Sequence, residues 1–391
     1  MLPCMSFSRR NLICYAAIAA PSAALLPVLG RSQLRASEGA TSILRFIPSS
    51  LHQGILDGSS KRDLSRYIQS GVDSGENLFF PGKASSKYAI DGQIQIRNHA
   101  QYLSSSGLVR LDFLGRAEDL NAIELLSGRR DGLSSSMTRQ AQSIAGFRIT
   151  GPEDAKYGSM IFVEEGTFFP RIERIFSESG VNRGYLGSLA DSFLRVHGTT
   201  KSYVNDVTIR DCVFAGVRNA GDPNFPACGI WIEGCIEGRV ENTKVFYFDE
   251  CMRLGNADSA TRNVQFMIFD QVQLEPTKPY DQADRQAALN IYLAHACNFR
   301  DCRFAVGNGA DRVNSVAVRV SGIAKQIRFR DCSFQGFRRA QNLLEISESG
   351  AADGIYISGA DIRDFVGDLT VNLGTARDIV FENSSILPPT I

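Results

Sequence analysis

The C-terminal half of the chain is built on a sequence repeat of 24 to 31 residues. A polar residue or a glycine marks each repeat, at Asp211, Asn242, Gln271, Asp301, Asp331, Gly359 and Asn383. An apolar residue lies two positions before each marker, a small or apolar residue follows it, and a mostly apolar residue lies three positions after it. A period of this size, made of short strand-like segments, is typical of a solenoid whose repeats stack on one another.

A second strand-like segment precedes the first in each repeat. Its pattern is an apolar residue, any residue and an apolar residue, at positions 194–196, 230–232, 252–254, 291–293, 318–320, 344–346 and 371–373. Alternation with a period of two places the flanking residues inside and the middle residue outside. No repeat contains a 3.6-residue periodicity long enough for two helices. We therefore predict an all-β fold, a single-stranded, right-handed parallel β-helix.

Composition limits the range of functions. The 391 residues include 42 lysines and arginines and 42 aspartates and glutamates, so the formal net charge is zero. A chain without a broad basic surface is not expected to bind nucleic acid. The length would suffice for two or three ordinary domains. The repeat instead predicts one elongated domain over residues 116–391, because each coil buries its core against its neighbours.

The cysteines indicate packing rather than chemistry. Cys212, Cys302 and Cys332 share one inward-facing repeat position, which predicts a column of small apolar core residues. No pair has the spacing of a metal site, and we expect no metal and no cofactor, although calcium stays an open alternative that the sequence does not indicate. Cys228, Cys235 and Cys251 lie outside the column, and a disulfide between two of them stays open.

Residues 1–36 have the pattern of an export signal. Ser8-Arg9-Arg10-Asn11-Leu12-Ile13 resembles a twin-arginine motif, and an alanine-rich apolar run follows it. Pro21 and Pro27 make a stable membrane span unfavourable. We expect the twin-arginine export machinery as a partner and a periplasmic or secreted bacterial protein. A chance arginine pair before a general secretory signal is the alternative, and it also predicts export.

Residues 37–115 are expected to cap the solenoid and to form its first coils. Asp57-Gly-Ser-Ser60 leads into a short amphipathic helix that places Leu64, Tyr67 and Ile68 on one face. Strand-like segments follow at residues 78–80, 88–90 and 94–96. An open solenoid end would expose apolar side chains and unpaired strand edges, so a capping helix is expected there. Residues 129–142, 222–226 and 275–286 are predicted to be surface loops.

The cap resembles the N-terminal signature of the pectate-lyase-like superfamily. The resemblance rests on the polar turn, the short helix, Phe79-Phe80-Pro81-Gly82 and the alternating residues of 88–96. This superfamily includes pectate lyases, rhamnogalacturonases, uronan epimerases and phage tailspikes. The resemblance implies a right-handed parallel β-helix, export and a polysaccharide substrate. The catalytic motifs of polygalacturonases, epimerases and pectate lyases are absent, so no catalytic residue is carried over.

Candidate binding residues lie on the outward side of the first strand. Equivalent residues of successive coils stack about 4.8 Å apart. The middle position of the first strand holds Phe162, Arg195, Trp231, Arg253, Tyr292, Arg319, Glu345 and Asn372. Aromatic faces pack on the C–H surfaces of sugars and arginine forks bind uronate carboxylates, so we predict that Arg195, Trp231, Arg253, Tyr292 and Arg319 bind the substrate. The alternative is an ordinary charged surface.

The next outward position gathers ionisable residues in three adjacent coils. Glu164, His197 and Glu233 occupy it, and small residues follow in later coils. An acid, an imidazole and an acid side by side would shift one another's pKa values, as catalytic groups require. We predict these three as catalytic. Because Glu164 lies in a less regular coil, a slip of one residue would turn it inward.

These residues predict a polysaccharide-cleaving enzyme acting on an acidic glycan. A glycoside hydrolase would use Glu164 and Glu233 as its carboxyl pair. A lyase would use Arg195 or Arg253 to neutralise the uronate and His197 or Tyr292 to remove its C5 proton. A non-catalytic carbohydrate-binding or surface-structural β-helix is the alternative, and a uronan epimerase is a third option. The outward column of the second strand mixes charge signs, which favours a ladder of ion pairs.

Overall fold

The computed structural model describes residues 39–97, 100–114, 120–127, 141–151, 156–177, 188–216, 228–256, 263–276, 287–306, 316–336, 342–365 and 368–387. The chain divides into two compact units, residues 1–40 and 41–391. The second unit contains all the helices and strands that are described. The predicted export signal and most of the three predicted loops lie outside the described residues.

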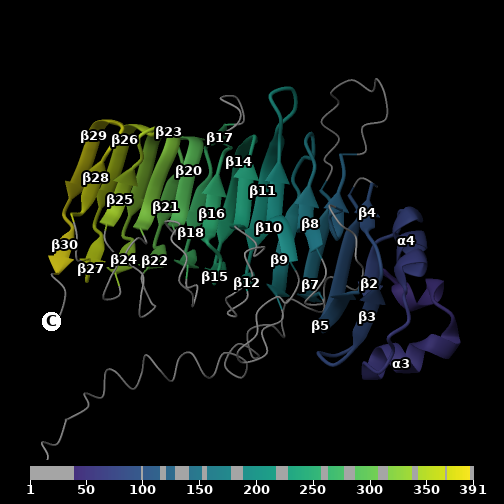
Figure 1. The fold of residues 1–391 in the computed structure, drawn as a ribbon. Helices are drawn as coiled ribbons and strands as arrows, with labels where there is room; N and C mark the ends of the chain where they lie inside the picture. The colour runs from purple at the N-terminus through teal and green to yellow at the C-terminus, as the bar shows by residue number, and fades with distance from the viewer. Residues whose placement is uncertain are drawn as a thin grey trace, which may run out of the picture. The chain divides into compact units, whose positions relative to one another are not determined.

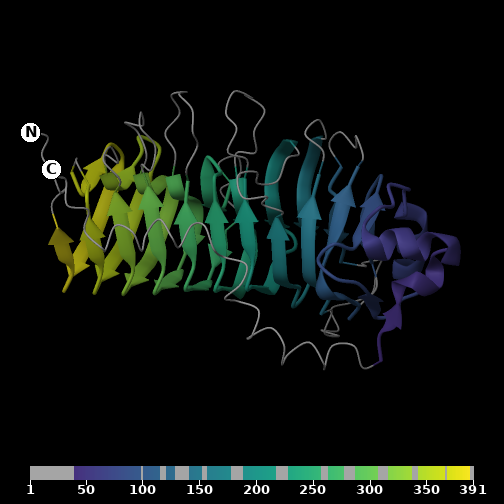
Figure 2. The same cartoon turned by 90° about the horizontal axis from the view of Figure 1, so that it is seen from below.

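The strands of the second unit form the coils of a parallel β-helix, as the repeat predicts. The thirty strands that the structure describes are joined in parallel pairings. Before the last coil, strands pair with their equivalents one coil further along the chain (Figures 1 and 2). Each complete coil contributes a strand to each of three sheets rather than the two that the sequence establishes. The third follows each repeat marker, where the apolar residue three positions on, such as Phe214, points inward.

The first sheet carries the segments that precede the marker strand. Its members are β4 (Ile94–Ile96), β6 (Ile123–Leu125), β8 (Lys156–Val163), β10 (Ser188–His197), β13 (Cys228–Glu233), β16 (Glu250–Leu254), the start of β20 (Ala287–His295), the start of β23 (Val316–Arg330), β25 (Asn342–Ile346) and β28 (Thr370–Asn372).

The second sheet ends at the repeat markers. Its members are β1 (Thr41–Ser42), β2 (Leu78–Phe80), the first halves of β5 (Tyr102–Phe113), β7 (Ser143–Thr150) and β9 (Arg171–Ser177), then β11 (Val204–Arg210), β14 (Cys235–Glu241), β17 (Val264–Gln265), β18 (Ile268–Asp270), the end of β20, β21 (Asn298–Arg300), the end of β23, β26 (Ala351–Ser358) and β29 (Thr375–Glu382).

The third sheet follows the markers. Its members are β3 (Lys87–Ile90), the second halves of β5, β7 and β9, then β12 (Val213–Ala215), β15 (Lys244–Phe246), β19 (Gln273–Glu275), β22 (Arg303–Val306), β24 (Ser333–Gly336), β27 (Asp361–Arg363) and β30 (Ser385–Leu387).

The core between the sheets is a set of columns of like residues. Phe269, Phe299 and Phe329 stack with ring centroids 4.3 and 4.8 Å apart and nearly parallel planes. The predicted column of Cys212, Cys302 and Cys332 is buried in the same way. Identical side chains stack because equivalent positions of adjacent coils lie at the strand spacing. The column of Phe rings removes large apolar areas from water.

The repeat markers form a tight turn between the second and third sheets. All seven markers have a positive φ, from 42° at Asn242 to 63° at Gly359. Asp, Asn and Gly tolerate this left-handed conformation better than other residues, which explains why they recur here. The amide of each of the first six markers donates to the carbonyl before the next marker, as from Asp301 N to Arg330 O at 3.1 Å.

A second left-handed position recurs five residues before every marker. It is occupied by Asp206, Glu237, Phe266, Ala296, Gln326, Gly354 and Asp378, and φ ranges from 51° to 77°. The sequence pattern did not reveal this position, because Phe, Ala, Gln and Glu are not typical of left-handed turns. The ladder of pairings on either side holds these residues in place.

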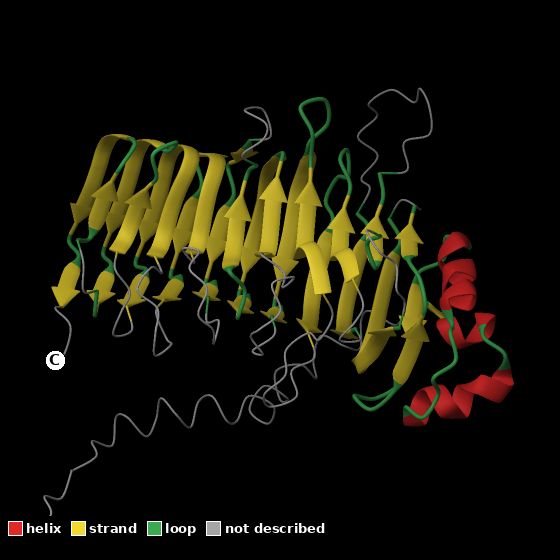
Figure 3. Cartoon of the chain, viewed as in Figure 1, coloured by secondary structure: helices red, strands yellow, loops and turns green. Residues whose placement is uncertain are grey.

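Two short helices lie at the N-terminal end of the stack (Figure 3). They are α3 (His52–Asp57) and α4 (Ser65–Asp73), and the 3-10 turns η1 (Ile43–Phe46) and η2 (Ser49–Leu51) precede them. The predicted amphipathic helix is α4, with Ile68 and Val72 buried against the core. Among the described residues, no helix is long and apolar enough to cross a membrane.

Candidate functional site

The outward row of the first sheet brings together most of the predicted binding residues. Pairing of the strands aligns Phe162 with Arg195, Arg195 with Trp231 and Trp231 with Arg253. Further along, Arg319 is aligned with Glu345. Four of the five predicted binding residues therefore occupy equivalent positions of their coils.

The predicted position of Tyr292 in this row is wrong. The residue that pairs with Arg253, and in turn with Arg319, is Asn290. The stretch 287–293 contains the apolar pattern twice, around Asn290 and around Tyr292, so alternation alone does not choose between them. Tyr292 still contacts the row, because the guanidinium carbon of Arg253 lies 5.5 Å from the centre of its ring. The last coil differs too, with Val371 in place of Asn372.

Glu233 is the centre of a compact charged cluster. Its Oε1 accepts hydrogen bonds from Nε and Nη2 of Arg195, at 2.9 and 2.6 Å. The same oxygen lies 2.5 Å from Nδ1 of His197. Its Oε2 accepts a hydrogen bond of 3.0 Å from Nδ2 of Asn256, a residue that the sequence pattern did not single out. His197 and Glu233 are directly paired residues of β10 and β13.

Glu233 is ionised in this environment. Its side chain is fully buried, with 0% exposed. Burial alone would raise the pKa of Glu233, but the hydrogen bond from His197 and the charge of Arg195 outweigh it and lower the pKa to about 2. A buried carboxylate needs such partners, because an unpaired charge inside a protein is strongly unfavourable.

The ring of Trp231 lies between two guanidinium groups. The guanidinium carbons of Arg195 and Arg253 are 4.1 and 4.7 Å from the ring centre, and the indole nitrogen donates to Gly255 O at 2.9 Å. Only 9% of Trp231 is exposed, although the sequence predicts a large exposed aromatic. The ring therefore holds the two arginines in place through cation–π contacts.

A second polar cluster continues the row. Glu250 receives hydrogen bonds from Nε of Arg253 and Nδ2 of Asn290, each at 2.6 Å. Oγ of Ser321 donates to Oδ1 of Asn290 at 2.8 Å. Burial opposes the charged form of Arg253, but nearby negative charge and the carboxylate of Glu250, which accepts the hydrogen bond from Nε, raise the pKa of Arg253 overall. The sequence does contain a signal for Asn290, because the apolar pattern of residues 289–291 places it on the outward side of the strand.

Glu164 does not join the His197 cluster. Its Oε2 accepts hydrogen bonds from the backbone amide and the hydroxyl of Ser127, at 2.9 and 3.3 Å. Among the described residues, no hydrogen bond or ion pair links Glu164 to His197 or Glu233. The regular pairing of β8 with β10 ends at Val163, so the side chain of Glu164 turns toward the preceding coil. Of the three ionisable residues predicted to lie together, only His197 and Glu233 are therefore in contact.

The cysteines that the structure describes form no disulfide. All seven that the structure describes, including Cys228, Cys235 and Cys251, are free and buried. Burial raises the pKa of the Cys212 thiol to about 12, which makes it unreactive. Within the described part of the chain, no group of three or more His, Cys, Asp or Glu side chains is arranged to hold a metal ion.

The second sheet carries some of the ion pairs expected for its outward column. Arg210 lies 2.9 Å from Glu173, and Arg300 lies 3.2 Å from Asp270. The polar marker residues also contact one another in one place, where Nδ2 of Asn242 donates to Asp211 at 2.7 Å. These contacts are at the surface and contribute little to stability.

Coils of parallel strands in three sheets define the class of protein: a right-handed parallel β-helix of the pectate-lyase-like fold. Solved structures with this fold resemble the chain. They include the enzymatically active domain of tailspike protein 4 of bacteriophage CBA120, with a TM-score of 0.55 and 12% identity over 89% of this chain and 44% of that one. A double mutant of the tailspike protein of E. coli bacteriophage HK620 has a TM-score of 0.54 and 10% identity, over 90% of this chain and 65% of that one.

A third similar structure is the tailspike protein of Acinetobacter baumannii phage AM24, with a TM-score of 0.51 and 13% identity, over 90% of this chain and 56% of that one. The chain thus spans about half to two thirds of the length of these proteins. At such identities the likeness concerns the fold. No protein-family model and no curated protein matches the chain.

Proposed function

We propose that the chain acts on a polysaccharide bound along its first sheet, with His197 as the proton-transfer group of a cleavage reaction. The observation that carries this proposal is the 2.5 Å contact between His197 Nδ1 and Glu233. Because an ionised carboxylate only accepts hydrogen bonds, Nδ1 bears the proton, and Nε2 of a neutral imidazole then carries the lone pair. With 21% of its side chain exposed, His197 is accessible to a glycan.

The reaction that this pair supports best is β-elimination at a uronate sugar. Nε2 of His197 removes the C5 proton, the released electrons form the C4–C5 double bond, and the C4–O bond breaks. The leaving oxygen then takes up a proton. The other base considered, Tyr292, is less suitable, because burial and the charge of Glu250 raise its pKa. Glu233 is a positioning residue that fixes the orientation and tautomer of the imidazole.

Hydrolysis by Glu164 and Glu233 has less support. A hydrolase needs one carboxylic acid that is protonated near neutral pH. The pKa of Glu233 is lowered to about 2, and Glu164 contacts Ser127 in the opposite direction along the stack. Neither residue matches the role of an acid that faces a second carboxylate across the scissile bond.

A non-catalytic carbohydrate-binding β-helix is the second candidate. One observation favours it: each predicted arginine of the first sheet already has a glutamate partner. Arg195 pairs with Glu233, Arg253 pairs with Glu250, and Nε of Arg319 donates to Glu345 at 3.0 Å. Paired guanidinium groups attract a uronate carboxylate less than unpaired ones. We further propose, from the Arg9-Arg10 pattern, that the protein acts outside the cytoplasm.

A depolymerase assay tests this function. The purified protein is incubated with polygalacturonate, alginate and neutral dextran, while ultraviolet absorbance of unsaturated uronides and new reducing ends are followed together. β-Elimination raises both signals with a uronate polymer, and His197→Ala abolishes both. His295→Ala, which changes a half-buried histidine of the second sheet, is the matched control. Reducing ends without absorbance would mean hydrolysis, and binding without either signal would favour the non-catalytic candidate.

A further inference from the structure

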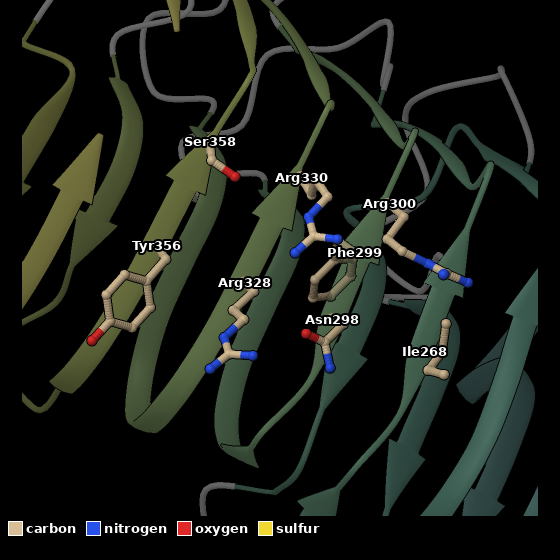
Figure 4. Close-up of a pocket in the computed structure, with 8 residues that line it drawn as sticks. All are labelled: Ile268, Asn298, Phe299, Arg300, Arg328, Arg330, Tyr356 and Ser358. Atoms are coloured by element: carbon tan, nitrogen blue, oxygen red, sulfur yellow. The ribbon is translucent and has the colours of Figure 1, made fainter. Parts of the chain in front are cut away.

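A shallow cavity of about 270 Å³ lies on the outward face of the second sheet. Its lining includes Arg300, Arg328, Arg330, Asn298 and Tyr356 (Figure 4). Strand pairing aligns Asn298 with Arg328 and Arg328 with Tyr356, and it aligns Arg300 with Arg330. Because Ile268 of β18, which pairs with Asn298, also lines it, the cavity spans four adjacent coils, on strands β18, β21, β23 and β26.

The charge in this cavity is unbalanced. Arg300 forms an ion pair with Asp270 at one edge. For the exposed side chains of Arg328 and Arg330, the described residues supply no ion pair and no hydrogen-bond acceptor. Toward the C-terminus, the next charged residue of the Arg330 row is Glu382, two coils away, because Ser358 lies between them. Adjacent like charges repel, so a surface that keeps them side by side is ready for an anionic ligand.

The first sheet presents the opposite situation. Its arginines are partly buried and each is paired with a glutamate, as at Arg195 and Arg253. Within the described part of the chain, guanidinium groups without an ion-pair partner that a carboxylate can approach, those of Arg328 and Arg330, therefore lie on the second sheet, away from the His197 cluster. The net charge of the chain is zero, so this is a local feature and not part of a broad basic surface.

We propose that the second-sheet cavity is an accessory binding site for the carboxylated sugars of an acidic polysaccharide. Planar guanidinium groups bind carboxylates through paired hydrogen bonds, and Arg328 and Arg330 present two of them on one strand. Tyr356, 39% exposed, supplies an aromatic face for the C–H surface of a sugar ring, and Asn298 supplies an amide. Coils repeat about every 4.8 Å, so successive sugars of an extended chain meet successive coils.

This site goes beyond the proposed function, because it needs no chemistry at His197 and holds for a cleaving or a non-cleaving protein. Two other anionic partners fit less well. A nucleic acid would require a broader basic surface than this one. A lipid surface would favour large apolar side chains exposed around the arginines. Of the apolar lining residues, Phe299 is buried and Ile268 half-buried, so they are not available for insertion into a lipid surface.

Binding of labelled polygalacturonate tests the site, with the carboxyl-reduced, neutral form of the same polymer as a second probe. The variant Arg328→Gln/Arg330→Gln is compared with Arg303→Gln/Arg363→Gln, which removes two exposed arginines from the third sheet. The change in net charge is the same in both. We expect the first variant to bind polygalacturonate about tenfold more weakly than the parent, and the control to bind it with an affinity within about twofold of the parent. The neutral polymer should bind to none of the three proteins.

A chemical footprint separates this site from the first sheet. Phenylglyoxal modifies accessible arginines, and bound polygalacturonate should protect Arg328 and Arg330 but not Arg303 or Arg363. Equal loss of binding in both double variants, or unprotected Arg328 and Arg330 under saturating polymer, would overturn the proposal. So would anionic phospholipid vesicles that bind through these arginines while polygalacturonate does not.

Discussion

His197 and Glu233 are paired across adjacent coils, with Nδ1 of the imidazole 2.5 Å from the carboxylate. One partner is fully buried and the other keeps a fifth of its side chain exposed. This difference gives them different roles. The buried carboxylate is fixed by Arg195, His197 and Asn256, whereas the imidazole is the partly exposed member of the pair.

Replacement of His197 by alanine should abolish polysaccharide cleavage, with a loss of stability of about 1–3 kcal/mol because the buried carboxylate of Glu233 loses one of its hydrogen-bond partners. Proton transfer by a positioned side chain contributes about 100-fold or more to a reaction rate, so cleavage should fall by at least that factor. Initial rates are compared for the parent, His197→Ala and the control His295→Ala, and urea unfolding monitors the fold. Equal rates in all three would remove His197 from the reaction.

Replacement of Glu233 by glutamine should destabilise the protein. It removes the buried carboxylate that pairs with the partly buried Arg195, and breaking a buried ion pair in this way costs about 3–5 kcal/mol. Urea unfolding at neutral pH measures the loss. Asp270→Asn is the control, because its ion pair with Arg300 is more exposed and should cost no more than about 1 kcal/mol.

The contribution of Glu233 should also depend on pH. Its pKa lies near 2 in the folded protein and at an ordinary value of 4.5 in the unfolded chain. The unfolded state thus binds the proton first, so the stabilisation is complete above pH 4.5 and is lost as the pH falls toward 2. We expect the stability difference between the parent and Glu233→Gln to narrow over this interval. A difference that stays constant down to about pH 2.5 would contradict the assigned pKa.

The coils could be predicted from the sequence because the repeat period and the alternation of apolar residues are both patterns along the chain. Marker residues such as Asp301 also had the correct location, at a turn. The left-handed position at Ala296 was missed, since pairing with the neighbouring coils enforces a conformation that alanine does not favour on its own. Tyr292 was misplaced because two overlapping apolar patterns satisfy the same alternation, and only the neighbouring strands select one.

The candidate site was predictable only as a row of positions. Alternation placed His197 and Glu233 on the outward side of adjacent coils, and the structure pairs them directly. It did not indicate that this outward row is buried, as Trp231 and Glu233 are. Nor did it indicate that Glu164 turns toward Ser127, because the pairing of its strand ends one residue earlier. Burial and side-chain direction depend on contacts between coils, which a periodic pattern does not contain.

The left-handed turn at the markers should discriminate between residues by backbone conformation. At Asp301, where φ is 50°, asparagine should be tolerated, whereas valine should cost about 1–2 kcal/mol because its branched side chain disfavours this region. The control is Arg303→Val, which places valine at an exposed strand position and should change the free energy of unfolding by no more than about 0.5 kcal/mol. Urea unfolding measures the free energies of unfolding of these variants and of the parent. If Asp301→Val is as stable as Asp301→Asn, turn conformation does not explain the repeat marker.

The stacked phenylalanines should dominate the stability of their coils. Phe299 lies between Phe269 and Phe329, so Phe299→Ala removes two stacked ring contacts and leaves a cavity, at a cost of about 3–5 kcal/mol. Phe266→Ala is the control, because half of Phe266 is exposed, and it should cost less than about 1 kcal/mol. Thermal and urea unfolding compare the two. Similar losses would show that ring stacking in the column adds nothing beyond ordinary apolar contact.

Replacement of Arg9 and Arg10 by lysine should block export if the N-terminal pattern is a twin-arginine signal. That machinery recognises the arginine pair itself, so a change that keeps the charge should still retain the full-length chain in the cytoplasm. Fractionation of expressing cells, with detection by antibody, measures the distribution. Lysines at Arg31 and Arg35 provide the control, because they make the same chemical change outside the motif. Undiminished export of Arg9→Lys/Arg10→Lys, with removal of the N-terminal segment, would instead indicate the general secretory route.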